Sequence, residues 1–181
     1  MKVIVLLANG FEECEALVTA DVLMRAGAEV QLVSVEDELT VVGTHGIKVV
    51  ADINISELYS DDMDALVLPG GMPGAQTLAD SLRVRALIEK AVRMGIYIGA
   101  ICAAPFILGR MGLLSGRNIA CYPGFEQYMP SAILTGRKVE IDDIFITAQG
   151  MGVSLEFGLK IAEMLFGEET SRKIAEQIQK A

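Results

Sequence analysis

The sequence predicts an α/β fold, a three-layer sandwich built on a mostly parallel sheet. Short apolar runs rich in branched residues alternate with segments of helical spacing, which is typical of parallel strands covered on both faces. The 181-residue chain is 52% hydrophobic and 22% charged, a composition that excludes a disordered chain. Its length fits one compact domain. We therefore expect a single domain over residues 1–181.

The first half of the chain begins with a strand, a helix and a second strand. Residues 2–8 form a continuous apolar run, residues 11–27 have apolar side chains at helical spacing, and residues 29–35 form another branched run. This order predicts a βαβ unit with parallel strands. Two short branched runs within residues 39–55 then predict a hairpin at an edge of the sheet.

The second half repeats the alternation. Residues 64–71 predict a buried strand that ends in Pro-Gly-Gly, and residues 74–95 predict a helix. A strand over residues 96–101 and a helix over residues 103–114 follow. The remaining predicted elements are a strand, an acidic turn and a strand over residues 137–149, and terminal helices over residues 154–167 and 168–181.

Loops at one edge of such a sheet are where function is expected. In open α/β sheets, ligands bind where loops leave the carboxyl ends of the parallel strands. Three loops of this chain are predicted at that edge: residues 9–13 (NGFEE), residues 68–75 (LPGGMPGA) and residues 99–105 (GAICAAP).

The charge balance argues against several classes of partner. Lys and Arg total 15 against 24 Asp and Glu, a formal net charge of -9, which repels nucleic acid and anionic membranes. No apolar stretch approaches the roughly 18 residues that a membrane helix needs, and the first residues lack a signal-peptide cleavage site. We therefore expect a soluble, cytoplasmic protein that binds neither nucleic acid nor membrane.

The cysteine and histidine content argues against a metal centre. Cys14, Cys102 and Cys121 are an odd number without C-x-x-C spacing, which disfavours a disulfide framework and a zinc site. The single histidine, His45, excludes a polyhistidine metal site. The Gly-rich loop also lacks the P-loop lysine and the dinucleotide-binding fingerprint. We expect a free thiol, no metal and no cofactor.

Cys102 follows the predicted strand 96–101 and precedes a helix, with small residues on both sides. This is the pattern of a nucleophile elbow, because a strained strand-to-helix turn accepts only small neighbours two residues away. The turn would expose the sulfur at the sheet edge, at a helix N-terminus that favours the thiolate. The same pattern also fits a buried cysteine that fills space in the core.

The Gly-rich loop favours a reactive thiol. Gly70 and Gly71 follow a buried strand and allow backbone N–H groups to converge on an anion. The N–H groups of Gly71 and Ala103 would donate to a carbonyl oxygen as charge develops on it, and Gly70 would line the site. The alternative is that the two glycines form only a tight turn.

Glu15 opens the predicted first helix together with Glu12 and Glu13, and all three acids complement the helix dipole. Glu15 has a second possible role because its helix begins at the same sheet edge as Cys102. A carboxyl group beside a thiolate must be protonated to avoid like-charge repulsion. A neutral Glu15 would donate a hydrogen bond to the sulfur and act as general acid and base.

Pattern alone leaves the remaining candidates open. His45 would suit as the base for a cysteine nucleophile, but it lies in the predicted hairpin and nothing places it beside Cys102. Tyr122 is either a hydroxyl that lines the site or a surface aromatic. Cys14 has the spacing of a packing residue, and Cys121 has no feature of its own.

Four segments of the chain carry a family resemblance. They are residues 7–27, 66–81, 99–105 and 152–165. In this order they resemble the signature segments of the ThiJ/PfpI superfamily, most closely the branch of the human parkinsonism-associated protein deglycase and bacterial YajL. The resemblance runs nearly end to end.

The resemblance implies a flavodoxin-like sandwich of the class I glutamine-amidotransferase-like kind, assembled as a homodimer. It also implies that Cys102 is easily oxidised and hydrogen-bonded to a protonated Glu15. The backbone donors of Gly71 and Ala103 would surround the sulfur.

The chain departs from the family pattern at four positions. The protease branch has a histidine directly after its cysteine, where this chain has Ala103, so we expect no peptidase activity. The deglycase branch often has arginine at the position of His45 and histidine at that of Tyr122, changes that bear on anion binding and proton transfer. Ala104 stands where the family's elbow has its second glycine, and it keeps a small residue there.

Two functions are consistent with the resemblance. The first is a cofactor-free glyoxalase or deglycase that acts on methylglyoxal-like 2-oxoaldehydes or glycated proteins under oxidative or carbonyl stress. Cys102 would add to the aldehyde as a hemithioacetal, and Glu15 would move protons. The second is a redox-sensing stress chaperone in which Cys102 is oxidised to a sulfinate. A structural subunit with an inert cysteine is the third reading.

Overall fold

The computed structural model describes residues 1–58 and 63–180, which contain a central sheet of seven strands. In spatial order these are β10 (Val139–Asp142), β11 (Phe145–Ala148), β7 (Tyr97–Ile101), β6 (Ala65–Leu68), β1 (Lys2–Leu7), β2 (Glu29–Ser34) and β5 (Ile53–Asn54). Each neighbouring pair is parallel except β10 and β11. The five longer parallel strands follow the flavodoxin-like order 2-1-3-4-5, so the predicted fold class is confirmed.

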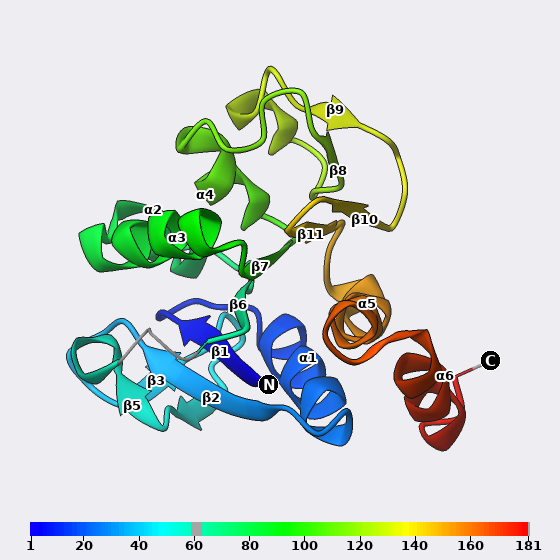
Figure 1. Cartoon of the computed structure of the whole chain (residues 1–181). Coiled ribbons are helices and arrows are strands. Elements are labelled where there is room, and N and C mark those ends of the chain that lie inside the picture. The colour runs from blue at the N-terminus through cyan, green and yellow to red at the C-terminus, as the bar shows by residue number, and fades with distance from the viewer. Residues whose placement is uncertain (59–62, 181) are drawn as a thin grey trace.

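Helices cover both faces of the sheet (Figure 1). One face carries α1 (Glu13–Arg25) and α5 (Ser154–Phe166), with α6 (Glu168–Gln177) packed outside α5. The other face carries α2 (Gly74–Asp80), α3 (Leu82–Met94) and α4 (Pro105–Arg110). None of the helices in the described part of the chain is long and apolar enough to span a membrane.

Strand β1 shows why an apolar run forms the centre of such a sheet. Residues 3–7 are all fully buried, and successive side chains point to opposite faces. Ile4 and Leu6 pack under α2, α3 and α4, whereas Val3 and Val5 pack under α1 and α5. Each side chain buried in this way contributes roughly 1.5–3 kcal/mol of transfer free energy.

Three predicted helices have different bounds in the structure. The predicted helix over residues 74–95 is two helices, because Ser81 has extended backbone angles and its hydroxyl accepts a hydrogen bond from Val84 N–H at 3.3 Å. Ser81 therefore ends α2 and caps α3. The helix predicted over residues 103–114 ends at Arg110, and the last helix ends at Gln177. Residue 181 lies outside the described residues.

The predicted hairpin exists, but its predicted place at the sheet edge is wrong. Strands β3 (Thr40–Val42) and β4 (Lys48–Val50) form a separate antiparallel pair, and β5 forms the edge of the main sheet. Gly10 N–H donates to Val42 O, and Thr44 N–H donates to Phe11 O, each at 2.8 Å. Because these bonds reach the loop after β1, the hairpin lies at the carboxyl edge of the parallel strands.

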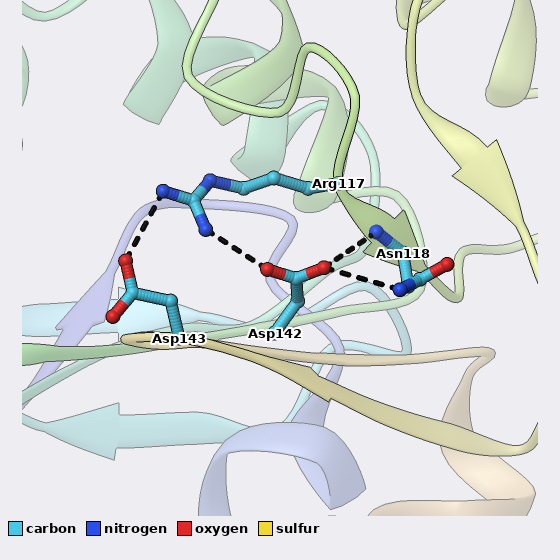
Figure 2. A network of polar contacts seen from close by, with 4 residues as sticks. All are labelled: Arg117, Asn118, Asp142 and Asp143. Atoms are coloured by element: carbon cyan, nitrogen blue, oxygen red, sulfur yellow. Dashed lines mark hydrogen bonds and ion pairs between the residues drawn. The ribbon is translucent and has the colours of Figure 1, made fainter.

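The segment before Tyr122 lies along the β10 edge of the main sheet, where polar contacts hold it in place. A small parallel pair that the sequence did not predict, β8 (Asn118–Ile119) and β9 (Ile133–Leu134), lies there. Arg117 contacts Asp142 at 2.9 Å and Asp143 at 3.1 Å, and Asp142 also accepts a bond from Asn118 N–H at 2.9 Å (Figure 2). The remaining elements are the short helices η1 (Ile55–Glu57), η3 (Glu126–Tyr128) and η4 (Met151–Val153).

Candidate active site

Cys102 lies directly after β7 with a backbone φ of 62°. This left-handed conformation is uncommon for a residue other than glycine, and it persists only where neighbouring structure holds it. Cys102 N–H donates to Ala148 O at 2.9 Å, and Cys102 O accepts from Tyr122 N–H at 2.9 Å. Helix α4 begins at Pro105. The geometry is that of the predicted strained strand-to-helix turn.

Glu15 projects from the first turn of α1 and is fully buried. Its Oε2 accepts a hydrogen bond from Gly70 N–H at 2.8 Å. A Cβ built at Gly70 would lie 2.7 Å from both this oxygen and Cys102 Cβ. The absence of a side chain at Gly70 therefore lets the carboxyl group and the cysteine meet.

The pKa of Glu15 is raised to about 7, chiefly because burial disfavours the carboxylate. Hydrogen bonds with the Cys102 side chain and Gly70 N–H oppose this rise, and the charge of Glu12 adds to it. A carboxyl group with this pKa is about half protonated at pH 7. Glu15 can therefore both give and accept a proton near neutral pH.

The pKa of Cys102 is raised to about 12 by burial, by the charge of Glu15 and by their mutual hydrogen bond. Hydrogen bonds from Ala103 N–H and Gly71 N–H act in the opposite direction. This rise is contrary to the thiolate expected from a helix N-terminus, because burial, followed by the charge of Glu15 beside the sulfur, favours the neutral thiol. The pair therefore releases one proton near pH 7 and holds the second.

Gly71 has a backbone conformation that favours glycine. Its φ is 86°, and a Cβ there would collide with Glu12 N and Gly10 O. Glu12 N–H donates to Gly70 O at 3.0 Å, which ties the Gly-rich loop to the start of α1. The loop that carries Gly71 and the first turn of α1, which carries Glu15, are therefore packed together.

His45 is held by Glu13 rather than by Cys102. Buried Glu13 accepts bonds from His45 N–H at 2.7 Å and contacts His45 Nδ1 at 2.9 Å. Burial alone would raise the pKa of Glu13, but hydrogen bonds from His45 and from the backbone N–H groups of Glu13 and Ile47 together outweigh it, and the pKa is lowered. The same hydrogen bond and the charge of Glu13 raise the pKa of His45. Glu13 therefore fastens the β3–β4 hairpin to α1.

One group of three side chains in the described part of the chain has the donor types of a metal site. Ligand atoms of Glu12, Glu13 and His45 lie within 4.8 Å of one another. These donors already have protein partners, because Glu13 and His45 bind each other and Glu12 Oε2 accepts Glu15 N–H at 2.6 Å. The cluster caps α1 and anchors the hairpin.

Tyr122 lies on another side of the thiol. Its backbone bonds to Cys102, and its side chain is half exposed. Gly150, which follows β11, lies beside both side chains, since a Cβ there would lie 3.3 Å from Tyr122 Cδ2 and 3.8 Å from Cys102 Sγ.

The structure thus brings together Cys102, Glu15, Gly70, Gly71 and Ala103, with Tyr122 alongside. Sequence reasoning missed the roles of Glu13 and Gly150. Gly150 carried a usable signal, because it follows a predicted strand at the same carboxyl edge as the other loops.

Comparisons with known proteins show the family and the fold of the chain. Residues 1–164 match the model of the DJ-1/PfpI family. Protein DJ-1 homolog B of Arabidopsis thaliana is 38% identical over 96% of this chain, which spans only 40% of that longer protein. Glutathione-independent glyoxalase DJR-1.2 of Caenorhabditis elegans is 34% identical over 90% of this chain and 87% of its own length.

A solved structure is also very similar. Oxidized DJ-1 of Toxoplasma gondii superimposes with a TM-score of 0.94 and 37% identity. The superposition covers 99% of this chain and 98% of that chain.

Proposed function

Because the chain belongs to the DJ-1/PfpI family, we propose that it is a cysteine-dependent glyoxalase or deglycase acting on 2-oxoaldehydes. The observation that carries the proposal is the left-handed Cys102 beside the buried Glu15, whose pKa is about 7. This pair supplies a nucleophile and a group that exchanges protons at neutral pH. The match to a relative named as a glutathione-independent glyoxalase supports the same reaction class.

The first chemical step joins the thiol to the aldehyde. The ionised Glu15 takes the proton of the Cys102 thiol while the sulfur forms a bond to the aldehyde carbon of methylglyoxal. The aldehyde oxygen then receives the proton, which completes a hemithioacetal. The N–H groups of Gly71 and Ala103, which bond to the sulfur in the resting site, lie where they can stabilise charge on the reacting group.

The second step moves hydrogen between neighbouring carbons. Glu15 removes the proton from the former aldehyde carbon, which gives an enediol, and returns a proton to the adjacent carbon. The first carbon is oxidised and the second is reduced, so no external electron carrier takes part. Water then cleaves the thioester on Cys102, which releases lactate and restores the thiol.

The test is turnover of methylglyoxal in a buffer free of glutathione, followed by nuclear magnetic resonance. We expect lactate to appear as methylglyoxal disappears, and in D₂O some lactate to carry deuterium at carbon 2, because Glu15 exchanges its proton with solvent. Chiral analysis should show one enantiomer, since the proton is returned from one side. Failure of the purified, reduced protein to form lactate would contradict the proposal.

A second function, redox sensing by a stress-responsive chaperone, rests on the same donors. The sulfur of the Cys102 thiol would attack hydrogen peroxide as Glu15 takes the thiol proton, which gives a sulfenic acid and, once that proton reaches the departing hydroxide, water; a second peroxide would give the sulfinic acid and another water. A protonated Glu15 and the N–H groups of Gly71 and Ala103 could hold the new oxygens. Cys121 is buried, whereas Cys102 is partly exposed. Burial raises the pKa of both thiols, so the selectivity would come from the access of peroxide to Cys102 and from these donors.

Mild peroxide treatment should therefore add two oxygens selectively at Cys102, with Cys121 unchanged. Peptide mass mapping over a time course measures this, and exposed Cys14 serves as the internal comparison. Equal oxidation of the three cysteines would count against a sensor role.

Further features of the protein are proposals on the family resemblance. We propose a homodimer, one domain over residues 1–181, and a cytoplasmic location in which small aldehydes or glycated proteins are the substrates. Ala103, in place of the protease branch's histidine, argues against peptidase activity.

A further inference from the structure

Gly150 lies beside the sulfur of Cys102. A Cβ built on Gly150 would lie 3.8 Å from Cys102 Sγ, 3.9 Å from Cys102 Cβ and 3.3 Å from Tyr122 Cδ2. The first two are ordinary van der Waals distances, and the third is tighter than most real contacts. A side chain at position 150 would therefore cover part of the sulfur and press on the Tyr122 ring.

The backbone does not explain why position 150 is glycine. Gly150 has φ 160° and ψ -169°, which is extended backbone that any residue can adopt. This differs from Gly71, whose φ of 86° favours glycine whatever surrounds it. At position 150, the missing side chain is thus explained by the space that it leaves next to Cys102 and Tyr122.

The Tyr122 ring forms one side of the space next to Gly150. Its backbone is fixed by the bond from its N–H to Cys102 O at 2.9 Å, while its side chain is half exposed. The ring also packs edge-on against Phe125, with ring centroids 6.5 Å apart. The hydrogen bond to Cys102 and the packing against Phe125 thus hold Tyr122 in place along this side of the space.

We propose that Gly150 and Tyr122 together form a size filter that determines which electrophiles reach Cys102. The space over Gly150 takes the substituent on the second carbon of a 2-oxoaldehyde, so the open filter accepts substituents larger than a methyl group. Filling position 150 confines the site to the smallest substrates. This inference rests on the proposed function for its substrate class, but the filter itself concerns access to the sulfur.

The test compares Gly150→Ala with a matched control in the same loop. Gly152→Ala is the control, because a Cβ at Gly152 has no other atom within 4 Å. Second-order rates of Cys102 modification are measured with hydrogen peroxide, iodoacetamide, N-ethylmaleimide and N-phenylmaleimide, using peptide mass mapping. Relative to peroxide, we expect N-phenylmaleimide to react about 10-fold or more slowly in Gly150→Ala, the scale of discrimination that one methyl group gives.

Three further comparisons show whether the effect is specific to position 150. Gly152→Ala should keep all four rates within about two-fold of the wild type, since surface substitutions of this kind have small effects. Modification of exposed Cys14 should be unchanged in every variant. Tyr122→Ala should act in the opposite direction and speed the bulky maleimide more than peroxide. This second variant also tests the filter if Gly150→Ala proves too unstable to assay.

Two results would overturn the filter. An equal slowing of all four reagents in Gly150→Ala would show that the added methyl group displaces the sulfur instead of screening it. Unchanged rates in both Gly150→Ala and Tyr122→Ala would show that reagents approach by another path.

The same variants separate this inference from the proposed function. With aldehydes, the ratio of phenylglyoxal to glyoxal turnover should fall in Gly150→Ala. If no aldehyde is turned over but the maleimide series behaves as expected, the filter stands and the proposed function fails. If aldehydes are turned over with an unchanged ratio and the maleimide rates are unchanged, the proposed function stands and the filter fails.

Discussion

Replacement of Cys102 by alanine is expected to lower the kcat/KM for methylglyoxal by about 1,000-fold or more, as removal of a covalent nucleophile does elsewhere. Without the sulfur, the hemithioacetal cannot form, and Glu15 has no tethered carbon acid from which to remove a proton. The measurement is the initial rate of lactate formation in glutathione-free buffer.

Cys14→Ala is the matched control for this change. Cys14 is exposed and lies on α1 next to Glu15 in sequence, so its loss tests whether any nearby thiol suffices. Its rate should stay close to that of the wild type. A Cys102→Ala protein that retains the wild-type rate, with the fold verified by circular dichroism, would exclude covalent catalysis at this site.

Replacement of Glu15 by glutamine should lower kcat by about 100- to 10,000-fold, the usual contribution of general acid–base catalysis. Glutamine keeps the size of the side chain and an oxygen that can accept from Gly70 N–H, but it cannot carry a proton between carbons. The wild-type rate should rise as pH passes through about 7, because the Glu15 carboxylate forms there. The variant should lack this inflection.

The same substitution should change how stability depends on pH. The folded-state pKa of Glu15 is raised from 4.5 to about 7, so the folded protein keeps a proton that the unfolded chain has released. Its stabilising contribution is therefore complete below pH 4.5, declines as pH rises to about 7, and is constant above that. The wild type should lose up to about 3 kcal/mol of unfolding free energy across this range.

Urea unfolding at a series of pH values measures this dependence. Glu15→Gln should be flat between pH 4.5 and 6.5, where the wild type declines, and Glu29→Gln, at an exposed position on β2, should follow the wild type. Glu13 and Asp142 have lowered pKa values, so their contributions change below their ordinary pKa values, outside this window. The raised pKa of His45 adds a decline above pH 6.5 that all three proteins share. The same decline in Glu15→Gln as in the wild type would show that Glu15 does not hold the proton.

The order of strands and helices along the chain, and the place of Cys102 and Glu15 at one sheet edge, could be predicted because both depend on local pattern. Apolar runs identified the parallel strands, and the small residues around Cys102 identified the turn that gives it a φ of 62°. Glu15 was predictable because the carboxyl ends of parallel strands meet at one edge. The break at Ser81 was not, since helical spacing continues on both sides of a residue that either extends or caps a helix.

The parts that failed depend on contacts between distant segments. Nothing in residues 39–55 shows that the hairpin bonds to Gly10 and Phe11 instead of extending the main sheet. The pKa of Cys102 depends on how deeply the sulfur and the Glu15 carboxyl are buried together, which spacing does not report. The space over Gly150 likewise exists only once Tyr122 has been placed by its bond to Cys102.

The left-handed backbone of Cys102 places selection for a stable protein and selection for a reactive thiol in opposition. At φ 62°, glycine would avoid the clash of the Cβ with the backbone, which costs a side-chain-bearing residue about 1–2 kcal/mol. Mutational drift toward glycine at this position would therefore yield a more stable but chemically inert protein. Selection for folding alone would not retain the cysteine, so its persistence in a lineage would itself record continuous use of the thiol.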